Sequence, residues 1–415
     1  MSELAPDTTE QRDLRGGRPP WSSGSNVARR RRLDQNMRCD VLVVGAGITG
    51  SLLAERLTAL GHRVCVIDRE RPGFGSTAAS TAMLQWEIDR PLSELCGLYG
   101  FERAAAIYQR SLQAVTGLKA LAETLRLNCN FRDRHSLYLA ADETGARELL
   151  AEHALRRRVG LPGEFLDYLT LVREFGFDRE AAIVSPGSAD ADPLLLSHGL
   201  IAAARRRGAL IFEADAVSYA SGAKTVTVGL GNGCEIEAGQ VVLATGYVMP
   251  DFVRTDLHKT ASSWALATPP QPPGALWRGG ALIWEASEDY LYARTTADSR
   301  IIIGGEDDDG ITDPGERDAL MPAKAAVILK KLKALVPQAN AAAEFVWSGA
   351  FGQTQDGLPL IGQVPGHPRI HAAYGYGGNG ITFSFLASRM IGRMIAGKHE
   401  ASDDDFAIDR SSPKE

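Results

Sequence analysis

The chain has few cysteines, no long apolar run and no excess of basic residues, and each absence excludes a class of protein. The five cysteines form no CxxC pair and their number is odd, so a disulfide framework is not expected and a reducing cytoplasm fits best. No uninterrupted apolar stretch approaches the roughly 18–20 residues that a transmembrane helix requires. The net charge of −6 argues against nucleic acid as a partner.

The first 36 residues differ in composition from the rest of the 415-residue chain. Residues 15–21 and the arginines at 29–32 offer little that could be buried, which favours a disordered tail over 1–36. An export signal would need an apolar stretch after the arginines, whereas residues 33–36 are polar. Met37 stands directly before the first predicted strand. It is therefore an alternative start residue, a hypothesis that an N-terminal peptide of the native protein would test.

A glycine-rich turn follows the first predicted strand. Residues 40–44 are apolar enough for a buried strand, 49–60 have apolar positions at helical spacing, and 63–67 predict a second strand that ends at Asp68. Between the first strand and the helix lies the motif Gly45-Ala46-Gly47-Ile48-Thr49-Gly50. A glycine motif in this strand–turn–helix context predicts a dinucleotide-binding site.

Each glycine of the motif has a separate physical role. Gly45 permits the tight turn, Gly47 lets backbone N–H groups approach a pyrophosphate, and Gly50 lets the helix pack closely on the strand. The helix N-terminus adds unpaired N–H donors and a positive dipole. Asp68 lies about 20 residues after the motif, where a carboxylate accepts hydrogen bonds from ribose hydroxyls.

Three later features favour FAD over NAD. A loop of mostly small residues, 69–80, directly follows the second strand, and an apolar strand at 241–243 ends in Ala244-Thr245-Gly246. A glycine-dense turn at 374–382 opens the last predicted helix. This turn provides a second helix N-terminus with close backbone access, which suits the electron-rich end of a flavin.

These segments resemble the D-amino-acid oxidase superfamily of FAD-dependent oxidoreductases, which includes glycine oxidase, sarcosine oxidase, D-amino-acid dehydrogenase and γ-glutamylputrescine oxidase. The resemblance rests on the Gly-Ser-Thr loop at Gly75, the Ala-Thr-Gly sequence at Ala244 and the segment 354–362. It implies an α/β fold (α+β overall) with two domains. A Rossmann-type FAD-binding domain is expected from the separated segments 37–87, 181–250 and 340–400. An antiparallel-sheet substrate domain is expected from 88–180 and 251–339, followed by a tail over 401–415.

The motif and the resemblance together imply a cofactor site. The resemblance assigns Asp68 to the adenosine ribose, Ser76 and Thr77 to the pyrophosphate or ribityl chain, Val217 to the adenine, and residues 377–382 to the pyrimidine side of the flavin. The residues predicted to bind FAD are Gly45, Gly47, Ile48, Thr49, Gly50, Asp68, Arg69, Ser76, Thr77, Val217, Thr245, Gly246, Gly377, Gly378, Asn379, Gly380, Ile381 and Thr382.

The resemblance also predicts non-covalent FAD. Some relatives attach the flavin through a cysteine at the position of Gly349 or through a histidine near Ala78 and Ala79. Neither glycine nor alanine can form that bond.

The usual carboxylate-binding arginines of amino-acid-specific relatives are missing. By the resemblance, Phe351 and Gln85 stand at the positions of the arginines in glycine oxidase and sarcosine oxidase. A guanidinium matches a carboxylate bidentately, and neither phenylalanine nor glutamine can replace it. Arg294, on a predicted strand, is another candidate, but it could equally be a structural arginine of the sheet.

Gln85, Trp86 and Glu87 follow the flavin loop and are expected near the isoalloxazine. A carboxylate beside an aromatic ring favours a cationic amine through charge and cation–π attraction. The alternative is that Trp86 packs at the domain junction and Glu87 pairs locally. The candidate substrate-site residues are therefore Gln85, Glu87, Arg294 and Phe351, and no metal site is predicted.

Two further patterns concern the rest of the chain. Runs at 281–285, 290–295 and 300–304 alternate and predict an antiparallel sheet. Acidic runs at 307–309 and 403–405 predict a solvated loop and a solvated tail.

The sequence thus predicts a cytoplasmic FAD-dependent oxidoreductase. It is expected to oxidise a C–N bond of a small amine or amino acid by hydride transfer to flavin N5, with oxygen or a quinone as acceptor. One alternative is an enzyme of the same fold that acts on a 2-hydroxy acid or a modified nucleoside side chain. Another is a non-catalytic electron-transfer subunit, which a truncated substrate domain would indicate; here that domain is full-length.

Overall fold

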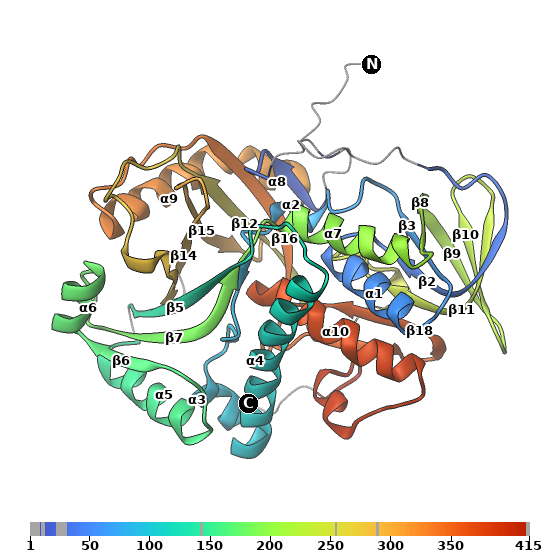
Figure 1. Cartoon of the computed structure of the whole chain (residues 1–415), viewed down its shortest axis with the longest axis horizontal. Coiled ribbons are helices and arrows are strands. Elements are labelled where there is room, and N and C mark those ends of the chain that lie inside the picture. The colour runs from blue at the N-terminus through green and yellow to red at the C-terminus, as the bar shows by residue number, and fades with distance from the viewer. Residues whose placement is uncertain are drawn as a thin grey trace.

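A computed structural model describes residue 9 and residues 13–21, 31–141, 144–253, 255–287 and 290–411. Two sheets lie side by side in it, a larger one of ten strands and a smaller one of eight (Figure 1). Helices cover the outer faces of both sheets, and α4 (Phe101–Thr124) packs against α10 (Gly380–Ile395) where the two halves meet. This arrangement matches the predicted α/β class with a Rossmann-type half and a second, sheet-based half.

The smaller sheet is parallel at its centre. Its main path runs β17-β18-β11-β2-β3-β8, with β9 and β10 extending from β11. Alternate residues of β2 and β3 join two different cores: Val41 and Val66 pack toward the helices, whereas Leu42 and Ile67 pack on the opposite side. Such burial on both faces explains why these strands are continuous apolar runs. The bounds are β2 (Met37–Val44), β3 (Val64–Asp68), β8 (Leu210–Glu213), β9 (Ala216–Ser221), β10 (Val226–Leu230), β11 (Glu235–Leu243), β17 (Leu360–Val364) and β18 (His367–Tyr374).

Three helices cover one face of the smaller sheet. They are α1 (Ile48–Ala59), α7 (Pro193–Arg206) and α10, and α1 contacts both of the others. Asp192 caps α7 by accepting a hydrogen bond from the Leu195 N–H, and Pro193 occupies its first turn. The helix predicted at 49–60 is confirmed by α1, which carries the glycine turn at its N-terminus.

The larger sheet is mostly antiparallel, in the order β1-β16-β12-β15-β14-β13-β5-β7-β4, with β6 also paired to β7. The runs predicted to alternate form β13, β14 and β15, whereas β13 and β5 pair in parallel. Helix α9 (Met321–Leu335) covers one face through Ile328 and Leu332. The bounds are β1 (Arg15–Gly17), β4 (Met83–Leu84), β5 (Arg132–Ala140), β6 (Glu164–Asp167), β7 (Ala181–Asp190), β12 (His258–Ala267), β13 (Leu282–Ala286), β14 (Leu291–Thr295), β15 (Ile301–Asp308) and β16 (Phe345–Thr354).

Shorter elements connect and flank the two sheets. The remaining helices are α2 (Ser76–Ala79), α3 (Leu92–Tyr99), α5 (Ala146–Arg158), α6 (Tyr168–Phe175) and α8 (Pro314–Ala319). The 3-10 turns are η1 (Asp251–Val253), η2 (Arg278–Gly280), η3 (Gly377–Asn379) and η4 (Ala401–Phe406).

The structure differs from the predicted domain segments at three strands. Residues 37–87, 181–250 and 340–400 were expected in the FAD-binding half, but β4, β7 and β16 lie within the larger sheet. β7 pairs with β5, β16 pairs with β12, and β4 pairs with β7, and each partner comes from a distant part of the chain. Because sheet partners distant in sequence decide which half a strand joins, the chain crosses between the halves inside the predicted segments.

The predicted disordered tail does not hold for residues 13–21. Arg15–Gly17 form β1, which pairs antiparallel with β16 through Arg15 and Gly349. The Arg15 side chain is fully buried and its Nε donates to the Phe74 carbonyl at 2.7 Å, while Trp21 Nε1 donates to the Ser80 carbonyl at 2.9 Å. An open edge of β16 thus orders this segment, and the segment in turn covers the loop after β3.

The acidic C-terminal run is also packed rather than solvated. Asp403 has no exposed side-chain surface and pairs with Arg110 at 2.7 Å and with Arg393 at 2.8 Å. Further on, Arg410 makes a buried bidentate pair with Asp356, both distances being 2.8 Å. Arginines of α4 and α10 and the Asp356 carboxylate therefore hold Asp403 and Arg410 of the predicted tail against the rest of the molecule.

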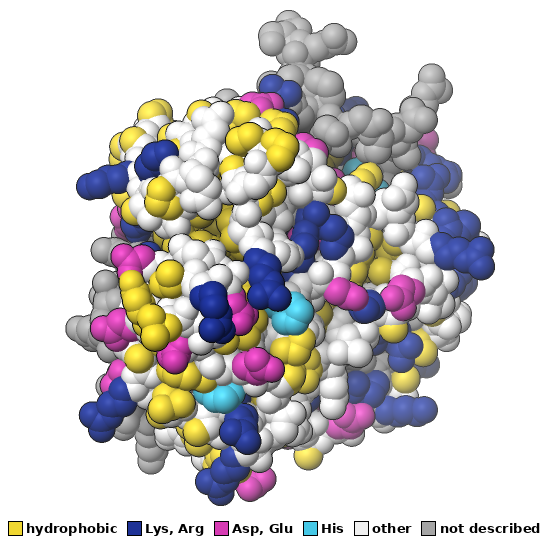
Figure 2. Space-filling view, turned by 60° about the vertical axis from the view of Figure 1, so that its left-hand side comes forward, with side chains coloured by type: hydrophobic (Ala, Val, Ile, Leu, Met, Phe, Trp, Pro, Cys, Tyr) yellow, Lys and Arg dark blue, Asp and Glu magenta, His cyan; other side chains and the backbone are white. Residues whose placement is uncertain are grey.

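The surface carries both signs of charge. On the face that Figure 2 shows, acidic and basic side chains are interspersed among apolar ones, without a broad area of one sign. In the part of the chain that the structure describes, no helix combines the length and apolar character needed to cross a bilayer.

Candidate active site

A cavity of about 740 Å³ lies between the two sheets. Its walls include the carboxyl ends of β2, β3 and β11 from the smaller sheet, and strands β12 to β16 from the larger one. Open parallel sheets bind their ligands at this edge, and the volume is in the range of small-molecule and cofactor sites.

The glycine turn forms one wall of the cavity. Gly45 has φ of +105°, and a Cβ there would lie 2.2 Å from the Ala244 carbonyl oxygen. A Cβ on Gly50 would lie 1.9 Å from the Gly45 carbonyl oxygen, so only glycine allows α1 to approach the turn. Gly47 is the N-cap of α1 without a side-chain cap, and a Cβ there would meet only Thr77 Oγ1, at 3.0 Å. The backbone at Gly47 therefore lies open to the cavity at the start of α1, as the close approach of a pyrophosphate requires.

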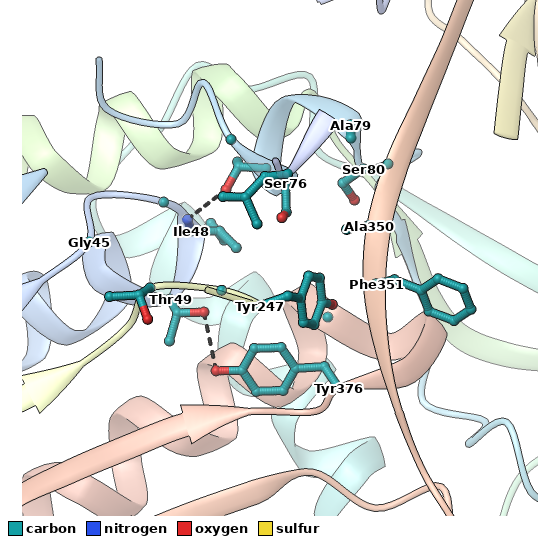
Figure 3. A pocket seen from close by; sticks show the side chains of 18 of the residues that line it. Gly45, Ile48, Thr49, Ser76, Ala79, Ser80, Tyr247, Ala350, Phe351 and Tyr376 are labelled. Carbon is teal, nitrogen blue, oxygen red and sulfur yellow. Dashed lines mark hydrogen bonds between the residues drawn. The ribbon is translucent and has the colours of Figure 1, made fainter. Parts of the chain in front are cut away.

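Polar side chains hold this turn in place. Thr77 Oγ1 accepts the Ile48 N–H at 2.8 Å, and Thr49 Oγ1 lies 3.2 Å from the Tyr376 hydroxyl, as Figure 3 shows. The Asp68 carboxylate accepts the N–H groups of Ala46 at 2.6 Å and of Glu70 at 2.9 Å. Burial raises the pKa of Asp68 to about 6.

The glycine-dense turn before α10 forms the opposite wall. Gly377–Asn379 form η3, and the Asn379 amide donates to the main-chain carbonyls of Gln85 at 3.1 Å and Glu87 at 2.7 Å. Thr382 Oγ1 donates to the same Gln85 carbonyl at 2.8 Å. The segment 85–87 is thus fixed to the start of α10 through its backbone.

Two aspartates and a group of aromatic side chains line the end of the cavity that the larger sheet forms. Asp89 Oδ2 accepts the Gly378 N–H at 2.7 Å. The side chain is exposed to the open cavity, where the surrounding protein reduces its solvation and raises the pKa of Asp89 to about 6, with a further increase from the charge of Asp307. Burial also raises the pKa of Asp307, whose carboxylate accepts the Tyr290 hydroxyl. The aromatic residues that line this end are Tyr247, Trp284, Tyr290, Tyr292 and Phe351.

Basic residues are scarce around the cavity. Among the described residues that line it, Arg69 is the single lysine or arginine, and it pairs with Asp13 beside the dinucleotide turn. No cysteine or histidine of the described chain lines the cavity. The described residues also contain no cluster of His, Cys, Asp and Glu that could hold a metal ion.

Comparison with known proteins agrees with this geometry. The family model for FAD-dependent oxidoreductases of the DAO type matches residues 40–394. The chain belongs to the DAO family of FAD-dependent oxidoreductases. It is 26% identical over 379 residues to gamma-glutamylputrescine oxidoreductase of Escherichia coli, covering 89% of this chain and 87% of that protein. It is 25% identical to glycine oxidase of Geobacillus kaustophilus, covering 88% of this chain and 95% of that protein.

Solved structures show the same fold. The crystal structure of glycine oxidase from Geobacillus kaustophilus superposes with a TM-score of 0.76 at 23% identity, covering 90% of this chain and 99% of that one. L-proline dehydrogenase from P. horikoshii gives a TM-score of 0.72 at 18% identity, covering 90% and 97%. The family fold is therefore present over nearly the whole described chain.

The cavity fits the FAD that the DAO family uses. The unblocked backbone at Gly47, the Asp68 carboxylate and the second helix start at 377–381 provide the donors and acceptors that a dinucleotide and a flavin ring need. Of the residues predicted to bind FAD, all line the cavity except Gly50 and Thr382. Gly50 instead permits close packing of α1, and Thr382 holds the Gln85 carbonyl.

The structure separates the four predicted substrate-site residues. Gln85, Glu87 and Phe351 line the cavity, whereas Arg294 does not. In Figure 3 the ring of Phe351 extends from β16 away from Tyr247 and Tyr376.

The guanidinium of Arg294 is bound to the main chain. Its Nη1 donates to the carbonyls of Thr81, Ala82 and Ala191 at 2.8–3.0 Å, and the residue is 2% exposed. Burial lowers the pKa of Arg294 to about 10. These contacts favour the interpretation of Arg294 as a structural arginine of the sheet over a role in substrate binding.

Glu87 is buried among local partners. Its carboxylate accepts the Ser136 hydroxyl and the Ser188 hydroxyl, the latter at 3.3 Å, and lies 3.9 Å from Arg156 Nη1. Arg156 in turn faces the ring of Trp86, whose Nε1 donates to the Pro186 carbonyl. The local-pairing alternative thus describes Glu87 and Trp86 better than a direct substrate contact.

Sequence reasoning missed the residues that give the substrate end its charge. Asp89 lies two positions after Glu87 and was not singled out, and Asp307 was assigned to a solvated acidic loop. The available signal was the position of Asp307 next to three alternating strands, since residues at strand ends often face a site.

Proposed function

We propose that this DAO-family enzyme oxidises a C–N bond of a cationic amine, with the substrate carbon delivering hydride to N5 of FAD. The observation that carries the proposal is the substrate end of the cavity, which has Asp89, Asp307 and five aromatic side chains but no described lysine or arginine. The site therefore offers negative charge and ring faces to its substrate.

Electrostatics favour an amine over a simple amino acid in such a site. A carboxylate that leaves water loses solvation of several kcal/mol and needs a charged partner in return. The arginine that the sequence offered as a candidate, Arg294, donates to three main-chain carbonyls and does not line the cavity. An ammonium group, in contrast, meets carboxylates and aromatic faces that attract it.

The side chains have distinct roles in this proposal. The turn at Gly45–Gly47 and the turn at 377–381 would hold FAD, which supplies the hydride acceptor when bound. The amine must lose a proton before its C–H bond can be oxidised, and the Asp89 carboxylate, beside the second turn, is the candidate acceptor. Aromatic side chains would exclude water and orient the substrate carbon.

Several finer points belong to the same proposal. FAD is bound non-covalently, because Gly349 and Ala79 line the cavity where some relatives carry an attachment residue. The names of the relatives, gamma-glutamylputrescine oxidoreductase and glycine oxidase, include both an amine and an amino acid, so the charge of the cavity decides between them here. Oxygen and a quinone both remain candidate acceptors, and the cytoplasm remains the proposed location.

Flavin bleaching under anaerobic conditions tests the proposal. The holoenzyme is mixed with glycine, D-alanine, sarcosine, putrescine or a γ-glutamyl amine, and loss of flavin absorbance is followed. We expect the amines to reduce the flavin fastest. Fastest reduction by glycine or D-alanine would contradict the amine preference, and no reduction by any of them would favour the electron-transfer alternative.

A further inference from the structure

Asp307 is turned into the cavity by an irregularity in the larger sheet. Along β12 and β15, Ser262 pairs with Asp308 and Trp264 pairs with Gly305, so two residues of β15 oppose one of β12. Glu306 within this bulge has φ of +59°, in the left-handed region that costs a non-glycine residue free energy. Bulges of this kind re-aim side chains and are frequent beside active sites.

Only one of the two oxygens of the Asp307 carboxylate accepts a hydrogen bond with good geometry from the described part of the chain. Oδ2 accepts the Tyr290 hydroxyl, whereas Oδ1 is buried and no donor of the described chain reaches it with good hydrogen-bond geometry. The Ser263 side chain interacts with this carboxylate and lowers its pKa. The charge of Lys324 lowers the pKa of Asp307, but Lys324 Nζ donates to the Glu306 carbonyl at 3.1 Å and this residue does not line the cavity. A buried carboxylate oxygen without a donor is costly and points to a ligand that supplies one.

The surroundings of Asp307 suit a cation. Trp284, Tyr290 and Tyr292 line the same cavity, and Trp284 is held in place by stacking on Tyr138 with ring centroids 3.8 Å apart. Asp89 and Asp307 line the same cavity, and the charge of Asp307 raises the pKa of Asp89. Asp307 belongs to the larger sheet, whereas Asp89 lies beside the turn before α10, where it accepts the Gly378 N–H.

We propose that Asp307, together with Trp284, Tyr290 and Tyr292, binds a second ammonium group of a diamine substrate, while the amine to be oxidised lies beside Asp89. This inference rests on the proposed function, because it assumes that the cavity takes amines. It makes Asp307 the residue that selects a substrate with two positive charges over one with a single charge. A purely structural Asp307 would only orient Tyr290.

Three ligands of equal chain length separate these roles. We would measure binding of 1,4-diaminobutane, butylamine and 4-aminobutyrate by titration calorimetry to holoenzyme whose flavin has been chemically reduced under anaerobic conditions, so that no turnover occurs. The three molecules carry an ammonium, a methyl group and a carboxylate at the distal end. The parent is expected to bind the diamine about tenfold or more tightly than butylamine, and 4-aminobutyrate most weakly.

Asp307→Asn keeps the size of the side chain and an oxygen for the Tyr290 hydroxyl but removes the charge. In this variant the ratio of diamine affinity to butylamine affinity is expected to fall close to one. Butylamine affinity itself is expected to change less than about twofold. Asp309→Asn is the matched control, because it removes the same charge from an exposed residue two positions further on. Trp284→Leu, which removes one ring face, is expected to reduce the diamine preference in part and serves as a second variant.

The outcomes are distinguishable from those of the proposed function. Equal binding of diamine and monoamine by the parent, or an unchanged preference in Asp307→Asn, would overturn this inference even if amines reduce the flavin. Loss of butylamine binding in Asp307→Asn to the same extent as diamine binding would indicate the structural role and would also overturn it. Failure of every amine to reduce the flavin would reject the proposed function, whereas the calorimetric preference would still decide the role of Asp307.

Discussion

The cofactor half and the substrate half of the cavity are specified in different ways. At the cofactor half, the shape of the site is determined mainly by local backbone geometry. Gly45 and Gly50 have no space for a Cβ, and Gly47 leaves the start of α1 open. At the substrate half, charge and ring faces come from β12 to β16 and from the segment after β4, which only the folded chain brings together. The difference teaches that a cofactor site can be specified by one short motif, whereas a substrate site depends on long-range packing.

Gly47→Val should produce the largest effect, because it blocks FAD binding at the cofactor half directly. The branched side chain would fill the space in which N–H groups approach the pyrophosphate, and its Cβ would already lie 3.0 Å from Thr77 Oγ1. We expect purified variant to lack FAD, as measured by the ratio of flavin to protein absorbance. Gly97→Val is the matched control, since a Cβ at that helical glycine meets nothing within 4 Å. Stoichiometric FAD in folded Gly47→Val would show that the dinucleotide site lies elsewhere.

Arg15→Ala should have the next largest effect, through the segment that covers the cofactor half. The substitution removes the buried Arg15 guanidinium, so the Phe74 carbonyl loses this hydrogen bond. The unfolding free energy should therefore fall by about 2 kcal/mol. Thermal unfolding of the holoenzyme and the rate of FAD loss on dilution should both report the change. Arg38→Ala, at an exposed arginine on β2, should change neither by a comparable amount. Equal behaviour of the two variants would show that β1 contributes little.

Acidification should weaken diamine binding at the substrate half by about tenfold per charge that is lost. Reduced solvation within the cavity raises the pKa of Asp89 to about 6, so this carboxylate is ionised and attractive above that pH and becomes neutral below it. Asp307 also has a raised pKa and acts in the same direction, while Tyr247 and Tyr290, which face Asp89, stay neutral because their pKa values are raised too. Glu87 lies on the same segment as Asp89, is buried, and has a raised pKa as well.

Calorimetry with 1,4-diaminobutane between pH 5 and pH 8 would follow this change, since the ligand keeps both charges over that range. Affinity should rise with pH and level off above about pH 7. Asp89→Asn should flatten the profile. Affinity that is independent of pH in the parent would contradict an acidic substrate end.

Glu87→Gln should have the smallest effect on selectivity, although Glu87 borders the same cavity. Its carboxylate already has the Ser136 and Ser188 hydroxyls and the charge of Arg156 as partners. We expect the ratio of diamine to monoamine affinity to change less than about twofold, whereas unfolding free energy should fall by about 1–3 kcal/mol because Arg156 loses a buried counter-charge. A loss of diamine preference as large as in Asp307→Asn would instead support the sequence-based prediction that Glu87 contacts the substrate.

Much of the cofactor half could be predicted from the sequence, because its determinants are contiguous. The strand, glycine turn and helix over 40–60 are one local unit, and the turn before α10 is another. The sheet assignment of β4, β7 and β16 could not be predicted in the same way, since each is decided by a partner strand elsewhere in the chain. Residue Arg15 illustrates this best: its strand has no partner until β16 is in place.

The substrate half was predicted less well for a related physical reason. A carboxylate such as Glu87 has the same appearance in a sequence whether it faces a ligand or Arg156. The acidic run at 307–309 resembled a solvated loop, and only the bulge opposite β12 turns Asp307 inward. The sequence left Arg294 open as a substrate residue or a structural arginine, because the three carbonyls to which it donates come from the distant segments around β4 and β7.

Anaerobic flavin reduction by 1,4-diaminobutane, compared with D-alanine at equal concentration, tests the central claim most directly. Purified holoenzyme would be mixed with each compound and flavin absorbance followed until it is constant. The acidic, aromatic substrate end predicts that the diamine bleaches the flavin and does so at least about tenfold faster than D-alanine. Faster bleaching by D-alanine, or a flavin that the diamine leaves oxidised, would contradict the proposal that this enzyme oxidises cationic amines.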